Sequence, residues 1–309
     1  MVERLADPIL DGVLSGVLIV DKPKGRTSHD VVQHLRRVLR TRSVGHAGTL
    51  DPMATGVLIV AIGEGTKLVP YLTAAEKRYE ASIALGTATD TLDAEGTVIE
   101  RANVPDGWME HVEAALDIER ARTSQAPPAY SAIRKDGVRA HVLARRGEDP
   151  GLAPRDVHAL YIECVRRIAH PPSIDVVLEV TKGYYVRSFA RDLAVALGTV
   201  GHLTALNRTR SGHMTLGEAS ALDAPDLRDR VLPVEHAAAR VLPALCLTEL
   251  GRDHAHAGRA IPRSEVGPRV GEAADVDVGE VVALLGADGR LVAIGERTPD
   301  GIRILRGFH

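Results

Sequence analysis

A loop of fourteen residues, 45–58, constrains this chain more than any other feature. Its glycines at 45, 48 and 56 permit a positive φ or the close approach of another molecule. Pro52 fixes its own φ and favours an extended conformation of Asp51. An Asx-turn, in which Asp51 caps local amides, would explain an isolated Asp-Pro pair. It would not explain why the glycines and small residues continue over all fourteen positions. The loop therefore presents one carboxylate to a bulky molecule from a backbone with few side chains.

The composition is that of an ordinary globular protein. The chain has 309 residues, of which 45% are apolar, and this predicts one large domain with a small one or two of moderate size. The beginning of the chain lacks the basic and long apolar regions of a signal peptide, and no apolar run approaches the ~20 residues of a membrane span. Cys164 and Cys246 lie far apart, which argues against a disulfide framework or a cysteine-based zinc site. We expect a cytoplasmic protein with no membrane contact.

The net charge of −3 hides an uneven distribution along the chain. Residues 16–46 contain seven Lys or Arg against two Asp, and residues 121–150 contain six basic residues against three acidic ones. The two basic segments are suited to contact the phosphate backbone of a nucleic acid from two sides. Solvated helix faces are the alternative interpretation of basic patches of this size.

Hydrophobic periodicity predicts an α+β fold, because strands and helices alternate without regular βαβ units. Thr27 or Ser28 can cap a helix that buries Val31, Val32 and Leu35. The predicted strands are 16–20, 56–63, 78–85, 157–168, 174–181 and 202–211, and the predicted helices are 28–39, 66–73, 108–122, 138–146 and 186–197. The strands 157–168 and 174–181 are expected to form an antiparallel pair.

The C-terminal part of the chain has a different character. Residues 225–243 contain charges and prolines typical of a join between domains. Residues 245–309 are rich in short strand-like runs and carry eight Arg against ten acidic residues, a poor balance for an independent nucleic-acid binder. We divide the chain into a domain at 1–240 and a small β-rich domain at 241–309, which by position and size suggests a PUA-like fold.

Four separated segments carry a resemblance to a known family. They are Leu18–Ser28, the loop 45–58, Lys77–Ala81 and Thr181–Leu193. Together they resemble the pseudouridine synthases, in particular the branch that acts on uridine 55 of transfer RNA. The match spans residues 16 to about 212, roughly two-thirds of the chain. It implies a mixed, largely antiparallel sheet flanked by helices.

The resemblance also implies three catalytic residues. Asp51 would attack the target nucleotide, and Tyr79 would stack on the base and take part in proton transfer. Arg187, in Gly183-x-Tyr185-x-Arg187, would form an ion pair with Asp51. Two alternatives remain open: Tyr79 as an aromatic residue of the core, and Arg191, one helical turn further on, as the partner of Asp51.

Further residues of the family's substrate pocket have counterparts here. By resemblance, His46 helps to hold the flipped nucleotide, and Lys22-Pro23 supports the catalytic loop. A buried structural histidine and an ordinary strand-end turn are the respective alternatives. The other substrate-binding positions that the resemblance assigns are Gly48, Thr49, Tyr185 and Leu206. The chain departs from the family pattern at His141, usually tyrosine, and at Tyr184, usually a small residue.

The chemistry explains these residue types. Isomerising uridine breaks an N–C bond, turns the base over and joins C5 to C1′, so nothing enters or leaves and no cofactor or metal is required. A carboxylate can act as nucleophile or stabilise an electron-poor ribose carbon. Burial disfavours an ionised carboxylate, and a fixed guanidinium opposes that effect. A stacked nucleotide must also be flipped out, which costs a few kcal/mol.

A basic insertion, about residues 123–153, is the last implied feature. Its beginning, Gln125–Ile133, resembles the start of a mobile segment that grips the transfer-RNA elbow. Arg145 and Arg146 in the following basic run are suited to phosphate contacts.

The sequence therefore predicts a transfer-RNA pseudouridine synthase that acts as a monomer on the T-arm stem-loop, without a protein partner. An RNA-folding activity could accompany catalysis. A non-catalytic RNA-binding protein would have no need of Asp51, Tyr79 and Arg187 together. A guide-RNA-dependent synthase would need long basic extensions, and a glycoside hydrolase would need a second carboxylate beside Asp51.

Overall fold

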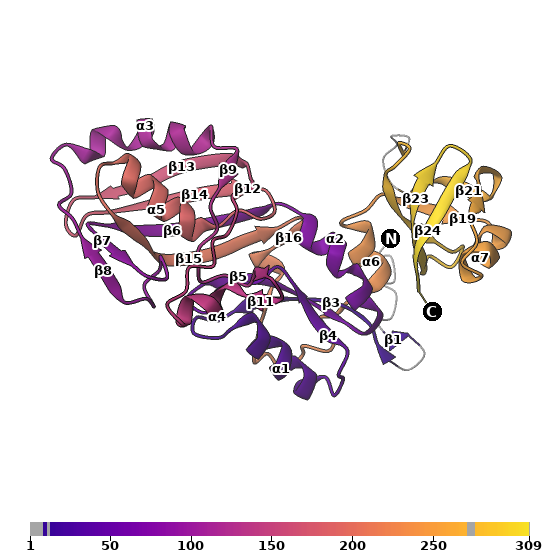
Figure 1. Cartoon of the computed structure of the whole chain (residues 1–309). Helices are drawn as coiled ribbons and strands as arrows, with labels where there is room; N and C mark the ends of the chain where they lie inside the picture. The colour runs from indigo at the N-terminus through magenta and orange to yellow at the C-terminus, as the bar shows by residue number, and fades with distance from the viewer. Residues whose placement is uncertain (1–8, 11–12, 271–275, 309) are drawn as a thin grey trace.

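The computed structural model describes residues 9–10, 13–270 and 276–308. One sheet of ten strands organises most of the chain, with the order β13-β14-β6-β15-β5-β3-β17 (Figure 1). Three short branches complete it, because β16 pairs with β15, β18 with β3 and β4 with β5. The strands are β3 (Gly16–Lys22), β4 (Val44–Ala47), β5 (Thr55–Ile62), β6 (Lys77–Leu85), β13 (Ala159–Ile168), β14 (Ser173–Val180), β15 (Gly201–Ser211), β16 (Met214–Thr215), β17 (Ser220–Ala221) and β18 (Leu232–Pro233).

The sheet is mixed but largely antiparallel, which confirms the predicted class. Only β15 with β5 and β17 with β3 run parallel among its pairs in the described chain. The predicted antiparallel pair is formed by β13 and β14. The strand β5 is buried almost along its whole length, as its continuous apolar run predicts, whereas β6 and β14 alternate between buried and more exposed positions.

Helices lie on both faces of the sheet, since the neighbouring β3 residues Val17 and Leu18 belong to two separate apolar clusters that helices cover. The main ones are α1 (Ser28–Val38), α2 (Val69–Ala74), α3 (Trp108–Arg120), α4 (Ala140–Arg145), α5 (Val186–Ala196) and α6 (Val234–Ala239), with 3₁₀ turns η1 (Gly63–Leu68) and η2 (Leu216–Glu218). Helices α3 and α5 lie over β13, β14, β6 and β15 (Figure 1). Because no helix of the described residues covers the other face of these strands, their alternate side chains there remain polar or half-exposed.

Helix α1 shows how directly the sequence determines local structure. Thr27 caps it, and a capping box forms because the Asp30 carboxylate accepts from the Thr27 amide while the Thr27 hydroxyl accepts from the Asp30 amide. Val31, Val32 and Leu35 are buried, as their helical spacing predicts.

The insertion differs in part from its prediction. A single helix was expected over 138–146, but β11 (Val138–Arg139) first pairs with β10 (Arg134–Lys135), and α4 begins only at Ala140. Gly137, with φ +83°, makes the tight turn between these strands, which local periodicity does not reveal. Other small strands are β1 (Ile9–Leu10), β2 (Val13–Leu14), β7 (Thr87–Thr89), β8 (Val98–Arg101), β9 (Ser124–Gln125) and β12 (Arg155–Asp156).

The C-terminal domain is β-rich, as predicted. Its sheet has the order β20-β24-β23-β22-β19-β21. Its elements are β19 (Ala244–Leu247), α7 (Glu249–His256), β20 (Ile261–Pro262), the 3₁₀ turn η3 (Arg263–Glu265), β21 (Val266–Val270), β22 (Val281–Leu285), β23 (Leu291–Thr298) and β24 (Gly301–Gly307). No helix within the described ranges is long and apolar enough to cross a lipid bilayer.

The segment between the domains is more than a join. Strand β18 pairs with β3 of the main sheet, and α6 buries Val234, Ala237 and Ala238. One apolar cluster combines these side chains with Val17 of the main sheet and Phe308 of the C-terminal domain. The C-terminal domain is therefore packed against the larger domain through a shared core.

Candidate active site

Asp51 lies in the loop between β4 and β5. Two glycines shape this loop, since Gly48 has φ +82° and Gly56 has φ +96°. A Cβ at Gly56 would lie 2.3 Å from the carbonyl oxygen of Arg208 on β15, so only glycine allows the strands to approach. The Asp51 side chain remains 32% exposed. The loop thus presents the carboxylate to solvent from a backbone that neighbouring strands hold closely.

Arg187 and Asp51 form a two-pronged ion pair. The Arg187 Nε lies 2.8 Å from Asp51 Oδ2, and Nη2 lies 3.0 Å from Oδ1. Nη1 also donates to the carbonyl of Thr91 at 2.9 Å, and Nη2 to that of Tyr130 at 3.0 Å. Asp93 adds a second carboxylate, 3.7 Å from Nε. Because every nitrogen of this planar group donates at least one bond, the guanidinium fixes the orientation of Asp51.

Helix α5 places Arg187 in its first turn, after the N-cap residue Tyr185. No side chain of the N-cap residue caps this helix, and the Gln125 carboxamide instead accepts from the Tyr185 amide at 2.8 Å. The positive end of the helix dipole therefore faces the Asp51 region and favours a negative charge there. Arg191, the alternative partner, is bonded to Asp192 and lies away from Asp51.

The two tyrosines have different surroundings. Tyr79 on β6 is 8% exposed and belongs to the main apolar cluster, and its hydroxyl forms no hydrogen bond within the described chain. Tyr185 is half-buried, and burial raises the pKa of its hydroxyl, an effect to which the Asp51 charge adds. The Tyr185 hydroxyl is therefore neutral at neutral pH.

Lys22 supports the loop from beneath. Its side chain is fully buried, and its ammonium donates to the carbonyls of Pro23, Arg26 and Pro52. Burial lowers the pKa of Lys22 to about 8, although the Asp51 charge opposes this shift. The bond to Pro52 connects the Lys22-Pro23 segment directly to the residue after Asp51.

Arg208 is a structural residue of the site that the sequence interpretation missed. It is 1% exposed, and its guanidinium donates to the carbonyls of Val57 at 2.7 Å and Gly48 at 2.9 Å. Within the described chain no carboxylate forms an ion pair with it. The sequence did contain a signal for its burial, because Arg208 lies two residues after Leu206 and therefore on the same, inward-facing side of a predicted strand.

Other cations near Arg208 respond to its charge. Lys77 donates to the carbonyls of Thr73 and Ala75, and its pKa is lowered to about 8 by burial and then by Arg208. His46 on β4 has a lowered pKa, first because of burial and second because of Arg208, and its buried Nδ1 has no partner in the described structure. His46 is therefore neutral at neutral pH.

The remaining predicted residues lie at several distances from this centre. Gly48 and Thr49 are in the loop itself, next to Leu50, which accepts from and donates to the Ser28 hydroxyl. Arg145 and Arg146 are exposed at the end of α4, in the insertion, and form no ion pair within the described chain. The insertion contacts the site through the Tyr130 carbonyl on Arg187.

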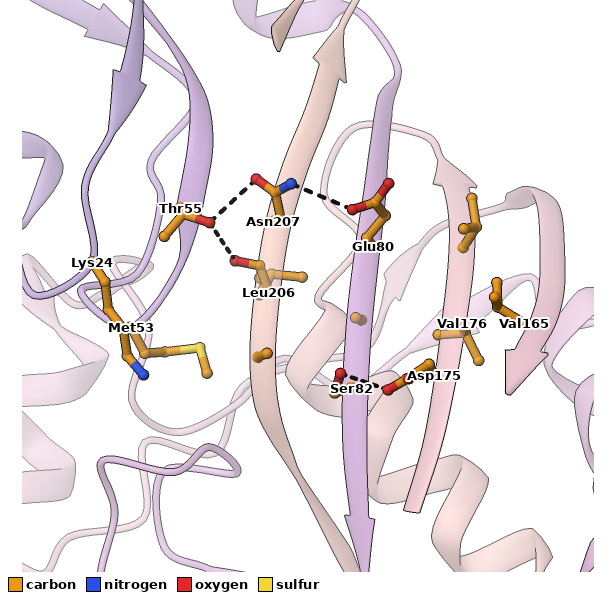
Figure 2. Close-up of a pocket in the computed structure, with 13 residues that line it drawn as sticks. Lys24, Met53, Thr55, Glu80, Ser82, Val165, Asp175, Val176, Leu206 and Asn207 are labelled. Atoms are coloured by element: carbon orange, nitrogen blue, oxygen red, sulfur yellow. Dashed lines mark hydrogen bonds between the residues drawn. The ribbon is translucent and has the colours of Figure 1, made fainter. Parts of the chain in front are cut away.

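A cavity of about 400 Å³ lies where β5 and β15 diverge (Figure 2). Of the predicted site residues, Leu206 lines it, whereas Asp51, Tyr79 and Arg187 do not. Thr55 donates to the Asn207 carboxamide, and Ser82 donates to Asp175 across it. The cavity is therefore lined mainly by β6, β14 and β15, and the carboxylate and its guanidinium lie outside its lining.

No group of three potential His, Cys, Asp or Glu ligands that could hold a metal occurs among the residues that the structure describes. The charged groups of the site are the carboxylates of Asp51 and Asp93, the guanidinium of Arg187 between them and several buried cations.

Comparison with known proteins identifies the class. The TruB family pseudouridylate synthase N-terminal domain matches residues 36–186. The tRNA pseudouridine synthase B of Mycobacterium sp. strain KMS is 43% identical over 295 residues, which cover 94% of this chain and 91% of that protein. The tRNA pseudouridine synthase B of Thermobifida fusca is 44% identical over 293 residues, covering 91% and 94%. The chain belongs to the TruB family of pseudouridine synthases and is an isomerase.

Solved structures show the same fold. A Cbf5-Nop10-Gar1 complex contains a chain with a TM-score of 0.73 and 24% identity, covering 95% of this chain and 85% of that one. An H/ACA RNP bound to a substrate RNA containing 2′-deoxyuridine gives a TM-score of 0.71 at 23% identity, with the same coverage.

Proposed function

We propose that this protein converts uridine 55 in the T-arm of transfer RNA to pseudouridine, with Asp51 as the reactive carboxylate. The observation that carries the proposal is the two-pronged contact of Arg187 with an accessible Asp51. The relatives named tRNA pseudouridine synthase B support transfer RNA as the substrate.

The reaction conserves every atom of the nucleotide. The bond from N1 to C1′ breaks, the base turns, and a C5–C1′ bond forms; C5 then loses its proton and N1 gains one. Asp51, oriented by its two bonds from Arg187, attacks either the ribose or the base. Tyr79 stacks on the turned base and takes part in the proton transfer from C5. Neither step calls for a metal or an organic cofactor.

The other residues hold the flipped nucleotide and its loop. His46 stays neutral and stabilises the flipped arrangement, while Lys22 and Pro23 keep the catalytic loop in place. Gly48, Thr49, Tyr185 and Leu206 line the substrate pocket, and Arg145 and Arg146 contact phosphates. Flipping costs a few kcal/mol, and these contacts offset that cost.

We assign catalysis to a domain at residues 1–240, with the RNA-gripping insertion at about 123–153, and a PUA-like fold to residues 241–309. The protein acts as a monomer in the cytoplasm and needs no protein partner. An RNA-folding activity on transfer RNA accompanies the isomerisation.

Mapping of pseudouridine in a transfer-RNA transcript tests the function. The purified protein is incubated with an unmodified transcript, and pseudouridine is located by chemical modification that stops reverse transcription. We expect one product, at position 55, and none in a transcript that carries cytidine there. Pseudouridine at another position of both transcripts, or at none, would refute the assignment.

A further inference from the structure

Four arginines gather at the C-terminal end of α1, about one helix length from the catalytic loop. Together with two polar residues they line a surface hollow of about 560 Å³. The lining residues are Gln33, Arg36, Arg37, Arg40, Thr41 and Arg42. We call the four arginines the α1 arginine cluster. In Figure 1, α1 lies at the lower edge of the larger domain, below β3 and β4.

The cluster has almost no internal compensation of charge. In the described chain none of its four guanidinium groups forms an ion pair. Arg36 donates to the carbonyl of Val44 at 3.0 Å and Arg37 to that of Gln33 at 3.3 Å. The Nε of Arg36 is buried and has no hydrogen-bond acceptor. Several donors are therefore available to an anion in the hollow.

The backbone at Arg40 is the second observation. This residue has φ +54°, a left-handed conformation that favours glycine and costs a side chain roughly 1–2 kcal/mol. In this geometry the Arg40 amide donates to the carbonyl of Arg37, and the Thr41 amide donates to that of Arg36, at the end of the helix. An arginine at a position suited to glycine is unfavourable for folding and needs another explanation.

Helix stabilisation explains only half of the cluster. Cations in the last turn of a helix interact favourably with its dipole, which accounts for Arg36 and Arg37. Arg40 lies beyond that turn, and it lines the same hollow as Arg36 and Arg37, so like charges share one surface. A bound polyanion would compensate this repulsion.

We propose that the α1 arginine cluster binds backbone phosphates of the substrate RNA outside the catalytic pocket. The proposal rests on the proposed function in that the polyanion is taken to be RNA. Ser28, at the beginning of α1, is bonded to Leu50 of the catalytic loop, and the eleven residues of α1 extend about 16 Å from there. The cluster therefore contacts nucleotides several positions away from the flipped one, or another strand of the RNA.

The salt dependence of RNA binding tests this assignment. The double variant Arg40→Gln/Arg42→Gln is compared with Arg259→Gln/Arg290→Gln, which removes two equally exposed arginines from the C-terminal domain. Binding of an unmodified transfer-RNA transcript is measured by filter retention from 0.05 to about 0.3 M salt. We expect the α1 variant to bind about tenfold more weakly at 0.1 M and its log–log slope to fall by about one to two units. The C-terminal variant should keep the wild-type slope.

The rate at saturating RNA separates phosphate binding from an indirect effect. Because β4 connects the cluster to the catalytic loop, a distorted loop would lower kcat. The proposal requires kcat of the α1 variant to stay within about twofold of wild type. An unchanged slope, or a lower kcat with unchanged affinity, overturns the proposal. A weaker affinity with a smaller log–log salt slope supports phosphate binding by the α1 arginine cluster, even if mapping finds no pseudouridine at position 55. The experiment on RNA binding and the experiment on uridine 55 can therefore fail independently.

Arg40→Gly provides a variant whose folding is secure. Glycine adopts φ +54° without strain, so the thermal midpoint should remain unchanged or rise by up to about 2 °C. The same variant should bind the transcript about threefold more weakly or worse, with a slope lower by nearly one unit. Stability and binding then change in opposite directions, which general damage to the protein cannot produce.

Discussion

The cations around Asp51 and the cations at the ends of α1 and α4 have the same charge but opposite surroundings. Arg187, Arg208 and Lys22 are at most 5% exposed and donate to carbonyls or carboxylates of the loop region. In the α1 arginine cluster and at the end of α4, by contrast, every arginine except the half-buried Arg36 is exposed. The first region should determine kcat, and the second should determine the affinity for RNA and its salt dependence.

The largest expected effect concerns the group that the buried cations hold. Asp51→Asn should lower the rate of isomerisation by about 10⁴-fold or more, because it removes the reactive charge and little shape. Affinity for transfer RNA should stay within about tenfold. Single-turnover rates and filter binding measure the two quantities. Turnover by the pure variant above that of a mock purification would remove Asp51 from its assigned role.

The paired arginine comes next. Arg187→Lys should lower kcat by about 100-fold, since lysine keeps the charge but cannot make two parallel bonds to Asp51. Arg191→Lys, four residues further along α5, is the matched control and should lose less than threefold. If Arg191→Lys were the more damaging change, the ion pair would have no special part in the reaction.

How far the sequence predicts this site depends on the range of the contacts. Apolar periodicity and capping residues are local, so α1 and the buried strand β5 could be predicted closely. Arg187 and Asp51 are 136 residues apart, and only the resemblance of separated motifs placed them together. The position of Arg208 on the buried side of β15 could be predicted from its spacing to Leu206, but its carbonyl partners could not, because tertiary structure sets them.

The region 225–243 shows a different limit. Its prolines and charges indicate a join, yet β18 adds to β3 and α6 lies in the shared core. Lys67 also donates to the carbonyl of Gly307 at 2.9 Å and lies over the Phe308 ring. Removing the residues beyond about 245 would therefore expose apolar surface of the larger domain. Because such a truncation would disturb folding as well as RNA binding, point variants are the better test of RNA binding.

Arg208→Met tests whether a buried cation without a carboxylate partner also acts on kcat. Loss of the bonds to Gly48 and Val57 should loosen the catalytic loop and lower kcat by about 10-fold, with affinity unchanged within about threefold. Arg210→Met is the control on the same strand, because Arg210 pairs with Glu179. If both substitutions lowered kcat equally, the loss would come from a general disturbance of β15. The bonds of Arg208 to the catalytic loop would then have no separate role.

The buried lysine predicts a pH dependence that exposed arginines do not share. The pKa of Lys22 is about 8 in the folded protein against 10.5 as its ordinary value, so between these pH values the unfolded chain binds more protons. The contribution of Lys22 to the free energy of unfolding therefore rises with pH across that window, by on the order of 1 kcal/mol. Urea unfolding of the wild type and Lys22→Gln at pH 7 and 9.5 should show a larger difference at the higher pH. A difference independent of pH would mean that Lys22 is more hydrated than its burial indicates.

The smallest effect on kcat should come from the exposed end of α4. Arg145→Gln/Arg146→Gln should flatten the log-salt slope of transfer-RNA binding by about one to two units. The reason is that a protein with fewer phosphate contacts releases fewer counterions when it binds. The rate at saturating RNA should stay within about twofold, since neither side chain contacts Asp51 or Arg187. An unchanged slope would show that these two arginines are a solvated surface. A reduced kcat would show instead that the insertion acts on the site, through the Tyr130 carbonyl that accepts from Arg187, and the separation between buried and exposed cations would not hold there.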